Sequence, residues 1–254
     1  MPHWHEPHEV AWLGDHLLAD QLVTGPISGV VLCFHGLGGA ALKEGPDPFD
    51  EEIAALGGLA VFPYYGPWSW MNREARAFVD DLVEAIYRRY DLDPARVPLV
   101  LTGGSMGGYS ALLYARYTRH QPVACFANCP VTDLAYHFSE RPDLPRTIYH
   151  ALGHYEGAWP ELLAEHSPLR QVAGLPDIDY LIVHGEADPA VAKSAHSDPL
   201  VAAMRARARR VEYLEVPGMG HCGPLPAEVA GRIHEFLKRA LTPPLSRTNV
   251  PSRS

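Results

Sequence analysis

The stretch that decides the fold reads Leu99-Val100-Leu101-Thr102-Gly103-Gly104-Ser105-Met106-Gly107-Gly108-Tyr109. An apolar run stops at two glycines, a serine follows, and an Ala/Leu-rich helical pattern comes next, which predicts a strand, a sharp turn and a helix. The serine and its neighbours match the Gly-x-Ser-x-Gly pattern of a nucleophile elbow. Only hydrogen fits at Gly103 and Gly107 in so tight a turn, so Ser105 is expected to have a strained backbone. A glycine-rich loop with an incidental serine is the alternative.

The elements predicted around this stretch indicate a mostly parallel sheet. A continuous apolar run, typical of a strand covered on both faces, lies at residues 29–34, and another buried strand is predicted at 58–63. Further strands are predicted at residues 122–127, 179–184 and 210–216. Helical patterns lie at residues 48–56, 74–90, 199–208 and 225–241. An antiparallel hairpin is predicted before them, at residues 9–22. Strands that alternate with helices in this way predict the α/β class, with helices on both faces of the sheet.

The length of 254 residues fits one domain, predicted at residues 1–242. Residues 129–177 carry prolines and aromatic side chains but no strong strand signal. Because this segment is too long for an ordinary loop, a small helical, cap-like insertion over the active-site edge is predicted there. Residues 243–254 are rich in Pro, Ser and Arg and are predicted to form a flexible tail.

The charge of the chain excludes several classes of partner. Lys and Arg number 21 and Asp and Glu 30, so the formal net charge is −9. Without a basic run, neither nucleic acid nor a membrane surface is expected to bind. There is no signal-like N-terminus and no apolar stretch of ~20 residues, so a cytoplasmic protein is expected. The oligomeric state is left open.

Cysteines and histidines do not predict a metal centre. The four thiols are too scattered for a disulfide framework or a zinc site and are predicted to be small buried apolar residues: Cys33, Cys125, Cys129 and Cys222. The histidines near the N-terminus form a solvated tail in the favoured interpretation and a metal cluster in the alternative: His3, His5 and His8. Neither a metal nor an organic cofactor is predicted.

Three reactive side chains follow three predicted strands. Ser105 follows residues 99–102, and Asp188 and His221 follow the last two strands. The carboxyl ends of parallel strands meet at one edge of a sheet, so these loops are expected to lie together. The order Ser, Asp, His is that of an α/β-hydrolase triad. His221 would remove the proton of the Ser105 hydroxyl, and Asp188 would orient the imidazole.

Each member of this predicted triad has an alternative. Asp188 precedes a proline and could begin a turn, which would leave Glu186 or Asp133 as the acid; the position of Asp188 in its loop favours Asp188. His221 could be a surface histidine. The glycines at 218 and 220 favour a close approach to a neighbouring loop instead.

An oxyanion site requires two donors, which are usually backbone N–H groups. Met106, the residue after the serine, is predicted to supply one and to benefit from the helix N-terminus. Leu37, in the glycine-rich loop after the first strand, is predicted to supply the other. His35 is expected to hydrogen-bond this loop.

An aromatic segment after residues 58–63 lies at the same edge. Its side chains Tyr65, Trp68 and Trp70 are predicted to form an apolar wall for the substrate, and a packed loop that binds nothing is the alternative. No Arg or Lys in these edge loops is placed to predict an anionic substrate.

Four motifs resemble those of the α/β-hydrolase superfamily and span about residues 25–240: His35-Gly36-x-Gly38, Gly103-x-Ser105-x-Gly107, His184-Gly185-x-x-Asp188-x-x-Val191 and Gly218-x-Gly220-His221. The second half, with Ser167-Pro168-Leu169, is most similar to the catalytic domain of the prolyl oligopeptidase family and to related small esterases. Only ~25 residues precede the core, which is too few for the β-propeller of the oligopeptidases. This difference favours an esterase. Dienelactone hydrolases, which share the layout, carry cysteine in place of the serine.

The sequence therefore predicts a hydrolase that cleaves a small-molecule carboxylic ester through an acyl-serine intermediate. A peptidase or amidase with the same triad is the nearest alternative. A non-catalytic binding protein on a hydrolase scaffold is less favoured because all three triad residues are present. Haloperoxidase-like or lyase chemistry also occurs on this fold. The acyl and alcohol groups of the substrate are left open.

Overall fold

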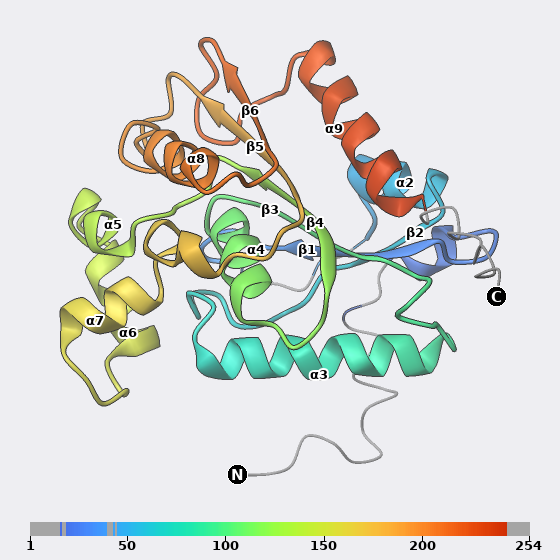
Figure 1. Ribbon diagram of the computed structural model, residues 1–254, viewed down its shortest axis with the longest axis horizontal. Helices are drawn as coiled ribbons and strands as arrows, with labels where there is room; N and C mark the ends of the chain where they lie inside the picture. Colours follow the sequence, from blue (N-terminus) through green and yellow to red (C-terminus); the bar gives the residue numbers. More distant parts are fainter. Residues whose placement is uncertain (1–15, 17–18, 40–42, 44, 243–254) are drawn as a thin grey trace, which may run out of the picture.

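The computed structural model describes residues 16, 19–39, 43 and 45–242 (Figure 1). Its six strands are β1 (Gly29–Phe34), β2 (Gly58–Val61), β3 (Leu99–Gly104), β4 (Pro122–Asn128), β5 (Asp179–Gly185) and β6 (Val211–Val216). They form one sheet in the order β2-β1-β3-β4-β5-β6, and every neighbouring pair is parallel. The predicted α/β class with a parallel sheet is confirmed.

Helices cover both faces of this sheet (Figure 1). They are α2 (Pro48–Ala55), α3 (Arg73–Arg89), α4 (Met106–Tyr117), α8 (Ser197–Ala206) and α9 (Ala227–Leu241). Apolar side chains of α3, α4 and α8 share one core cluster with Val30 and Leu32 of β1. Those of α2 and α9 share a second cluster with Val31. Alternate residues of one strand therefore pack against opposite helical layers, as expected for a strand buried on both faces.

Helix α3 shows how local sequence sets these elements. The Asn72 side chain accepts a hydrogen bond from Ala75 N at 3.0 Å and so caps the first turn. Arg88 and Arg89 end the helix, where positive charge complements the helix dipole. Between these ends, Val79, Leu82, Val83 and Ile86 are buried against the sheet. The amphipathic pattern of the sequence predicts this helix to within one residue at each end.

The strand order places Ser105 at a crevice. From β1 the chain passes to β2 at the sheet edge and returns to β3 on the other side of β1. Loops that leave β1 and β3 therefore diverge, and ligands bind at such points in open α/β sheets. Ser105 directly follows β3.

The segment 129–177 is helical, as predicted. It contains α5 (Leu134–Glu140), α6 (Leu144–Leu152), α7 (Trp159–Glu165) and the 3₁₀ helix η3 (Pro168–Gly174). Helices α5, α6 and α7 lie together to one side of the sheet (Figure 1). Leu134, Leu144 and Ile148 are fully buried and join the core cluster of α3 and α4.

The predicted antiparallel hairpin at 9–22 is wrong where it can be compared. Residues 9–15 and 17–18 lie outside the described residues, and Asp20–Leu22 form the 3₁₀ helix η2. Leu22 N and Val23 N donate to carbonyl groups three residues back, so this segment closes a local turn instead of pairing with a strand. The N-terminal histidines and the tail at 243–254 also lie outside the described residues. Within the described part, no helix has both the length and the apolar character needed to cross a bilayer.

Candidate active site

Ser105 occupies a sharp turn between β3 and α4. Its φ of 58° is in the left-handed region, which is costly for a residue with a side chain. Two glycines allow the turn to close. A Cβ on Gly107 would lie 2.1 Å from the Phe34 carbonyl oxygen, and one on Gly103 would lie 2.4 Å from the Gly107 backbone. Both approaches exclude any side chain, so the sequence pattern is explained by packing at this point.

The side chains of Ser105, His221 and Asp188 form one hydrogen-bonded chain. His221 Nε2 lies 2.8 Å from Ser105 Oγ, and His221 Nδ1 lies 2.7 Å from Asp188 Oδ2. The three residues come from loops after β3, β6 and β5, separated by 116 and 33 positions in the sequence. The structure thus brings together the three side chains that are predicted from the sequence to lie together.

The environment of Asp188 keeps its carboxylate ionised. Burial opposes the charge, but hydrogen bonds from His221 and from the backbone N–H groups of Val191 and Ala190 outweigh it and lower the pKa of Asp188 below its usual value. Those backbone bonds measure 3.0 and 2.8 Å. An ionised Asp188 can only accept, so His221 Nδ1 carries a proton and Nε2 is free to accept the Ser105 hydroxyl.

The two alternative acids have other environments. Asp133 caps α5, where its side chain accepts from Ala135 N and Tyr136 N, and it pairs with Arg170 at 3.0 Å. Glu186 is exposed at the start of the loop that carries Asp188. Asp188 is therefore the carboxylate that contacts His221.

A cavity of about 460 Å³ lies beside Ser105. Its lining includes Gly36, Leu37, Trp70, Met106, His137, Arg141, Val191 and Cys222. Both residues predicted to supply oxyanion donors are in this lining. Met106 is the first residue of α4, where backbone N–H groups lack acceptors within the helix and the dipole favours negative charge.

The predicted aromatic wall is only partly present. Trp70 lines the cavity, whereas Tyr65 and Trp68 are not among its lining residues. Tyr65 is 7% exposed, stacks on His35 at 4.2 Å, and donates to the His35 carbonyl oxygen at 3.0 Å. Trp68 is exposed and meets the edge of His150. Positive φ values at Trp70 and Met71 turn the chain here, so neighbouring aromatic residues point to different surroundings.

His35 hydrogen-bonds the loop after β1, as predicted, with Nδ1 2.9 Å from the Gly36 carbonyl oxygen. Packing against Tyr65 places its ring in the interior, where burial lowers the pKa of His35. A neutral ring in this position supports the loop that presents Leu37.

Two lining residues come from the helical segment, and no local pattern in the sequence points to either. His137 is on α5, and Arg141 follows it. Arg141 corrects the expectation that the edge loops place no Arg or Lys toward the substrate. Its guanidinium pairs with Asp143 at 2.6 and 3.1 Å. Only the packing of α5 over the sheet edge brings these side chains to Ser105.

A partly buried carboxylate connects α5 to the loop that carries Asp188. Glu140 Oε2 lies 2.6 Å from His137 Nδ1 and 3.0 Å from His196 Nε2, while Glu140 Oε1 accepts from Ala192 N. Burial opposes ionisation of Glu140, but these three hydrogen bonds outweigh it and hold its pKa well below the usual value. The network fixes His137 at the cavity wall.

The prediction that all four thiols are buried is wrong for Cys222. Cys125 and Cys129 are buried and Cys33 is partly buried, but Cys222 is exposed in the loop of His221. Cys222 N donates to Cys129 Sγ at 3.4 Å. Two thiols therefore meet beside the histidine.

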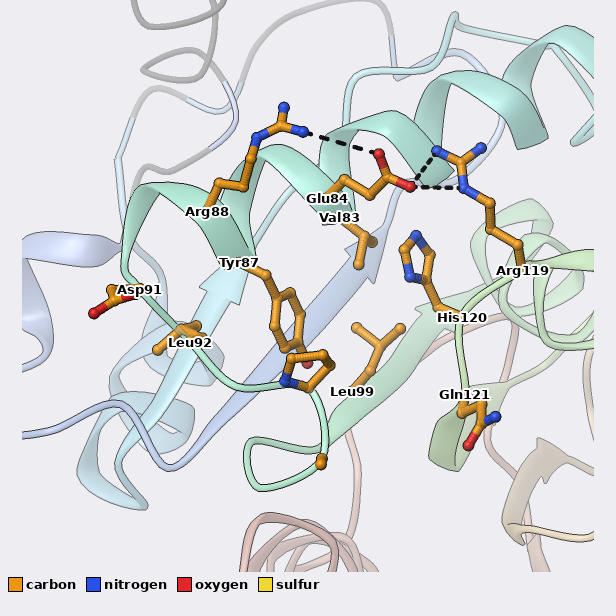
Figure 2. Close-up of a pocket in the computed structure, with 12 residues that line it drawn as sticks. Val83, Glu84, Tyr87, Arg88, Asp91, Leu92, Leu99, Arg119, His120 and Gln121 are labelled. Atoms are coloured by element: carbon orange, nitrogen blue, oxygen red, sulfur yellow. Dashed lines mark hydrogen bonds and ion pairs between the residues drawn. The ribbon is translucent and has the colours of Figure 1, made fainter.

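Two further cavities differ in their relation to Ser105. One of about 420 Å³ meets the Ser105 cavity at Gly104 and Cys222, and its apolar lining is Phe34, Phe49, Phe62, Phe126, Leu225 and Ile233. Another, of about 710 Å³, is shown in Figure 2. Leu99 lines it at the opposite end of β3 from Ser105, and Arg119 there is paired with Glu84. The cavity of Figure 2 is thus separate from the candidate site.

Comparison with protein families and solved structures agrees with the observed fold. The sequence model described as the prolyl oligopeptidase family matches residues 70–242. No curated protein sequence gives a match. Among solved structures, a Mycobacterium tuberculosis puromycin-hydrolyzing peptidase is similar with a TM-score of 0.64 and 22% identity over 85% of this chain. Pyrococcus horikoshii acylaminoacyl peptidase is similar with a TM-score of 0.73 and 14% identity over 88%.

The lengths of these proteins differ. The chain covers 35% of the puromycin-hydrolyzing peptidase and 39% of the acylaminoacyl peptidase, so it spans little more than a third of each. It covers 78% of esterase B from Lactobacillus Rhamnosis (HN001), with 85% of this chain aligned, a TM-score of 0.63 and 15% identity. These likenesses establish the fold.

Proposed function

The chain belongs to the prolyl oligopeptidase family of serine hydrolases, and we propose that it hydrolyses carboxylic esters through an acyl-serine intermediate. The observation that carries this proposal is the continuous chain Ser105–His221–Asp188, with contacts of 2.8 and 2.7 Å. A serine hydroxyl is a weak nucleophile at neutral pH and requires such a base.

In the proposed mechanism His221 Nε2 takes the Ser105 proton as Oγ attacks the ester carbonyl carbon. The N–H groups of Leu37 and Met106 stabilise the oxyanion that forms. His221 then gives the proton to the leaving alcohol, and the acyl group stays on Ser105. Water, deprotonated by His221, attacks the acyl-serine and releases the carboxylic acid. Asp188 stabilises the imidazolium in both halves of the reaction.

The lining of the cavity favours an ester over a peptide with a free N-terminus. Among the described lining residues there is no Asp or Glu that could pair with an ammonium group, and the permanently charged side chain is Arg141. The adjoining cavity of about 420 Å³ carries charged side chains (Lys43, Asp47, Asp50 and Glu52), but its phenylalanine and aliphatic side chains offer an apolar surface for an acyl chain. The proposed substrate is therefore a small-molecule ester with an apolar acyl group.

A fluorophosphonate probe and a panel of p-nitrophenyl esters test the proposal. We expect stoichiometric labelling at Ser105, identified by mass spectrometry of the modified peptide, and turnover with a burst of p-nitrophenol. The Ser105→Ala protein, with the same secondary structure by circular dichroism, serves as the control. Wild-type turnover by that variant, or no labelling of the wild type, would refute the proposal.

A peptidase or amidase activity is the second candidate, favoured by the family and by the peptidase names of two similar structures. Aminoacyl and N-acyl-aminoacyl p-nitroanilides test it with the same chromophore. If kcat/KM for any of these amides equals or exceeds that for the best ester, the second candidate replaces the first.

A further inference from the structure

Two thiols and the triad histidine meet at one point beside Ser105. The Sγ atoms of Cys129 and Cys222 and a ring nitrogen of His221 all lie within 4.8 Å of one another. Cys129 follows β4 and Cys222 follows His221, so 93 positions separate the thiols. Both are free cysteines.

The backbone holds both thiols in unusual conformations. The φ angles of Cys129 and Cys222 are 45° and 47°, in the left-handed region. Cys129 N donates to the Val183 carbonyl oxygen at 2.7 Å, and Cys222 N donates to Cys129 Sγ at 3.4 Å. Strained backbone conformations persist only where surrounding contacts hold them, so the surrounding structure holds the two thiols in place.

This donor set has the chemistry of a zinc site. Two thiolates and one imidazole are typical ligands of Zn²⁺, with bonds of about 2.3 Å to sulfur and about 2.0 Å to nitrogen. Ligand atoms in such a tetrahedron lie roughly 3.3–3.8 Å apart. Shifts of about 1 Å would bring the three atoms to these positions, and Cys222 is exposed, which gives an ion access.

We propose that Cys129, Cys222 and His221 form a site for a thiophilic divalent cation such as Zn²⁺, which inhibits the enzyme when bound. Binding releases the two thiol protons to solvent and leaves the fourth position of the tetrahedron for water. Oxygen-seeking cations such as Mg²⁺ and Ca²⁺ do not compete, because the donors are sulfur and nitrogen.

Inhibition follows from the position of His221. Its Nε2 contacts Ser105 Oγ and its Nδ1 contacts Asp188. Ligation through either nitrogen therefore breaks one link of the triad and removes the base from Ser105. The inhibitory part of the inference rests on the proposed catalytic role of His221, whereas metal binding itself does not.

Cobalt spectroscopy tests binding independently of hydrolysis. We expect Co²⁺ added to the reduced, metal-free protein to give a thiolate-to-cobalt charge-transfer band in the near ultraviolet, saturating at one equivalent and displaced by Zn²⁺. The thiolate band distinguishes this site from cobalt held by histidines alone, such as His3 and His5. Ser105→Ala, inactive under the proposed mechanism, retains all three ligands and is expected to give the same band.

Two cysteine variants provide the comparison. Cys222→Ser removes an exposed ligand and is expected to lose the band, whereas Cys33→Ser alters a thiol outside the cluster and is expected to keep it. Zn²⁺ at one equivalent is expected to lower wild-type ester hydrolysis at least tenfold, reversibly with a chelator. In Cys222→Ser the same fractional inhibition is expected to need about 100-fold more Zn²⁺. Each variant is compared with itself without metal, and Mg²⁺ is the control cation.

The outcomes separate this inference from the proposed function. A wild-type protein that shows no thiolate band, or a Cys222→Ser protein that keeps it, overturns the metal site whatever the hydrolytic activity. A cobalt band in a protein that hydrolyses no ester supports the metal site and refutes the proposed function alone.

Discussion

His221 Nε2 lies 2.8 Å from Ser105 Oγ, although the two residues are 116 positions apart in the chain. Ser105 follows β3 and His221 follows β6, with β4 and β5 between them in the sheet. No local segment could hold these atoms in contact, so the hydrogen bond depends on the complete parallel sheet. The contact between the two side chains is therefore a property of the fold.

Replacement of Asp188 by Asn tests the third member of this chain. An amide can donate to His221 Nδ1 and so stabilise the tautomer that carries its proton on Nε2, which cannot accept from Ser105. We expect kcat for an activated ester to fall by about 10⁴-fold with little loss of stability. Steady-state hydrolysis of a p-nitrophenyl ester measures the effect.

The matched control is Glu186→Gln, which neutralises an exposed carboxylate in the same loop. Its kcat is expected to stay within about twofold of wild type, because exposed substitutions away from a site have small effects. Equal losses in the two variants would show that loop charge, rather than the contact of Asp188 with His221, supports activity.

The triad could be predicted from the sequence because its information is local. Each of Ser105, Asp188 and His221 follows a segment with the pattern of a strand, and parallel strands bring such positions to one edge. Gly103 and Gly107 mark the turn because backbone lies within 2.5 Å of where their Cβ atoms would be. Strand patterns and glycines required by close packing can both be recognised in the amino-acid sequence.

The remaining lining could not be predicted, for a physical reason. Arg141 reaches the cavity through the packing of short helices, and the direction of Tyr65 relative to Trp70 depends on the positive φ values at Gly66 and Trp70. The exposure of Cys222 likewise depends on how one loop lies over another. Tertiary packing decides such features, and neither periodicity nor composition encodes it.

Glycine substitutions at the elbow test the steric argument. Gly107→Ala would place a methyl group 2.1 Å from the Phe34 carbonyl oxygen, which is backbone and cannot move aside. We expect a loss of more than about 3 kcal/mol in the free energy of unfolding, or no folded protein. Gly231→Ala in α9 meets nothing within 4 Å and is expected to add up to about 1 kcal/mol.

Urea unfolding followed by circular dichroism compares the two variants, and expression yield reports on Gly107→Ala if it does not fold. A Gly107→Ala protein with wild-type stability would mean that the elbow is wider than these distances indicate.

Protonation of His166 is expected to make the stability of the fold depend on pH. Burial, then the charge of Arg76, lowers the pKa of His166 from 6.5 to about 4. Its bonds suit the neutral ring, since Nδ1 donates to the Leu162 carbonyl oxygen at 2.8 Å and Nε2 accepts from Arg76 at 3.1 Å. Between pH 6.5 and 4, His166 is protonated in the unfolded chain but stays neutral in the folded chain. The free energy of unfolding therefore decreases as the pH falls toward 4.

The expected loss from this group between pH 7 and pH 5 is ~2 kcal/mol, measured from urea unfolding at both values. In His166→Gln the free energy of unfolding at pH 7 is expected to be lower, because two hydrogen bonds are disturbed, but its change between pH 7 and pH 5 is expected to shrink. If the variant keeps the full wild-type change, His166 is not the titrating group.

Arg141 predicts that the cavity also accepts an ester with a carboxylate on its acyl chain, through an ion pair that competes with Asp143. The guanidinium lines the cavity and is held by Asp143 at 2.6 Å, with both side chains partly exposed. Exposed pairs of this kind contribute about 1 kcal/mol or less, so an incoming carboxylate can compete with Asp143. Arg141→Gln is expected to raise KM about fivefold for an ester with a carboxylate on its acyl chain and to leave KM for a neutral ester within about twofold.

Asp143→Asn tests the same pair in the opposite direction. Without its carboxylate partner Arg141 is free for the substrate, so KM for the acidic ester is expected to fall while KM for the neutral ester does not change. Arg146→Gln on α6 alters an exposed arginine outside the cavity lining and is the control for net charge. If Arg146→Gln and Arg141→Gln shift KM for the acidic ester equally, the effect is long-range and Arg141 does not contact the substrate. Opposite shifts in Arg141→Gln and Asp143→Asn would also follow from their opposite changes in net charge, so they identify the pair at the cavity only when Arg146→Gln leaves KM for the acidic ester unchanged.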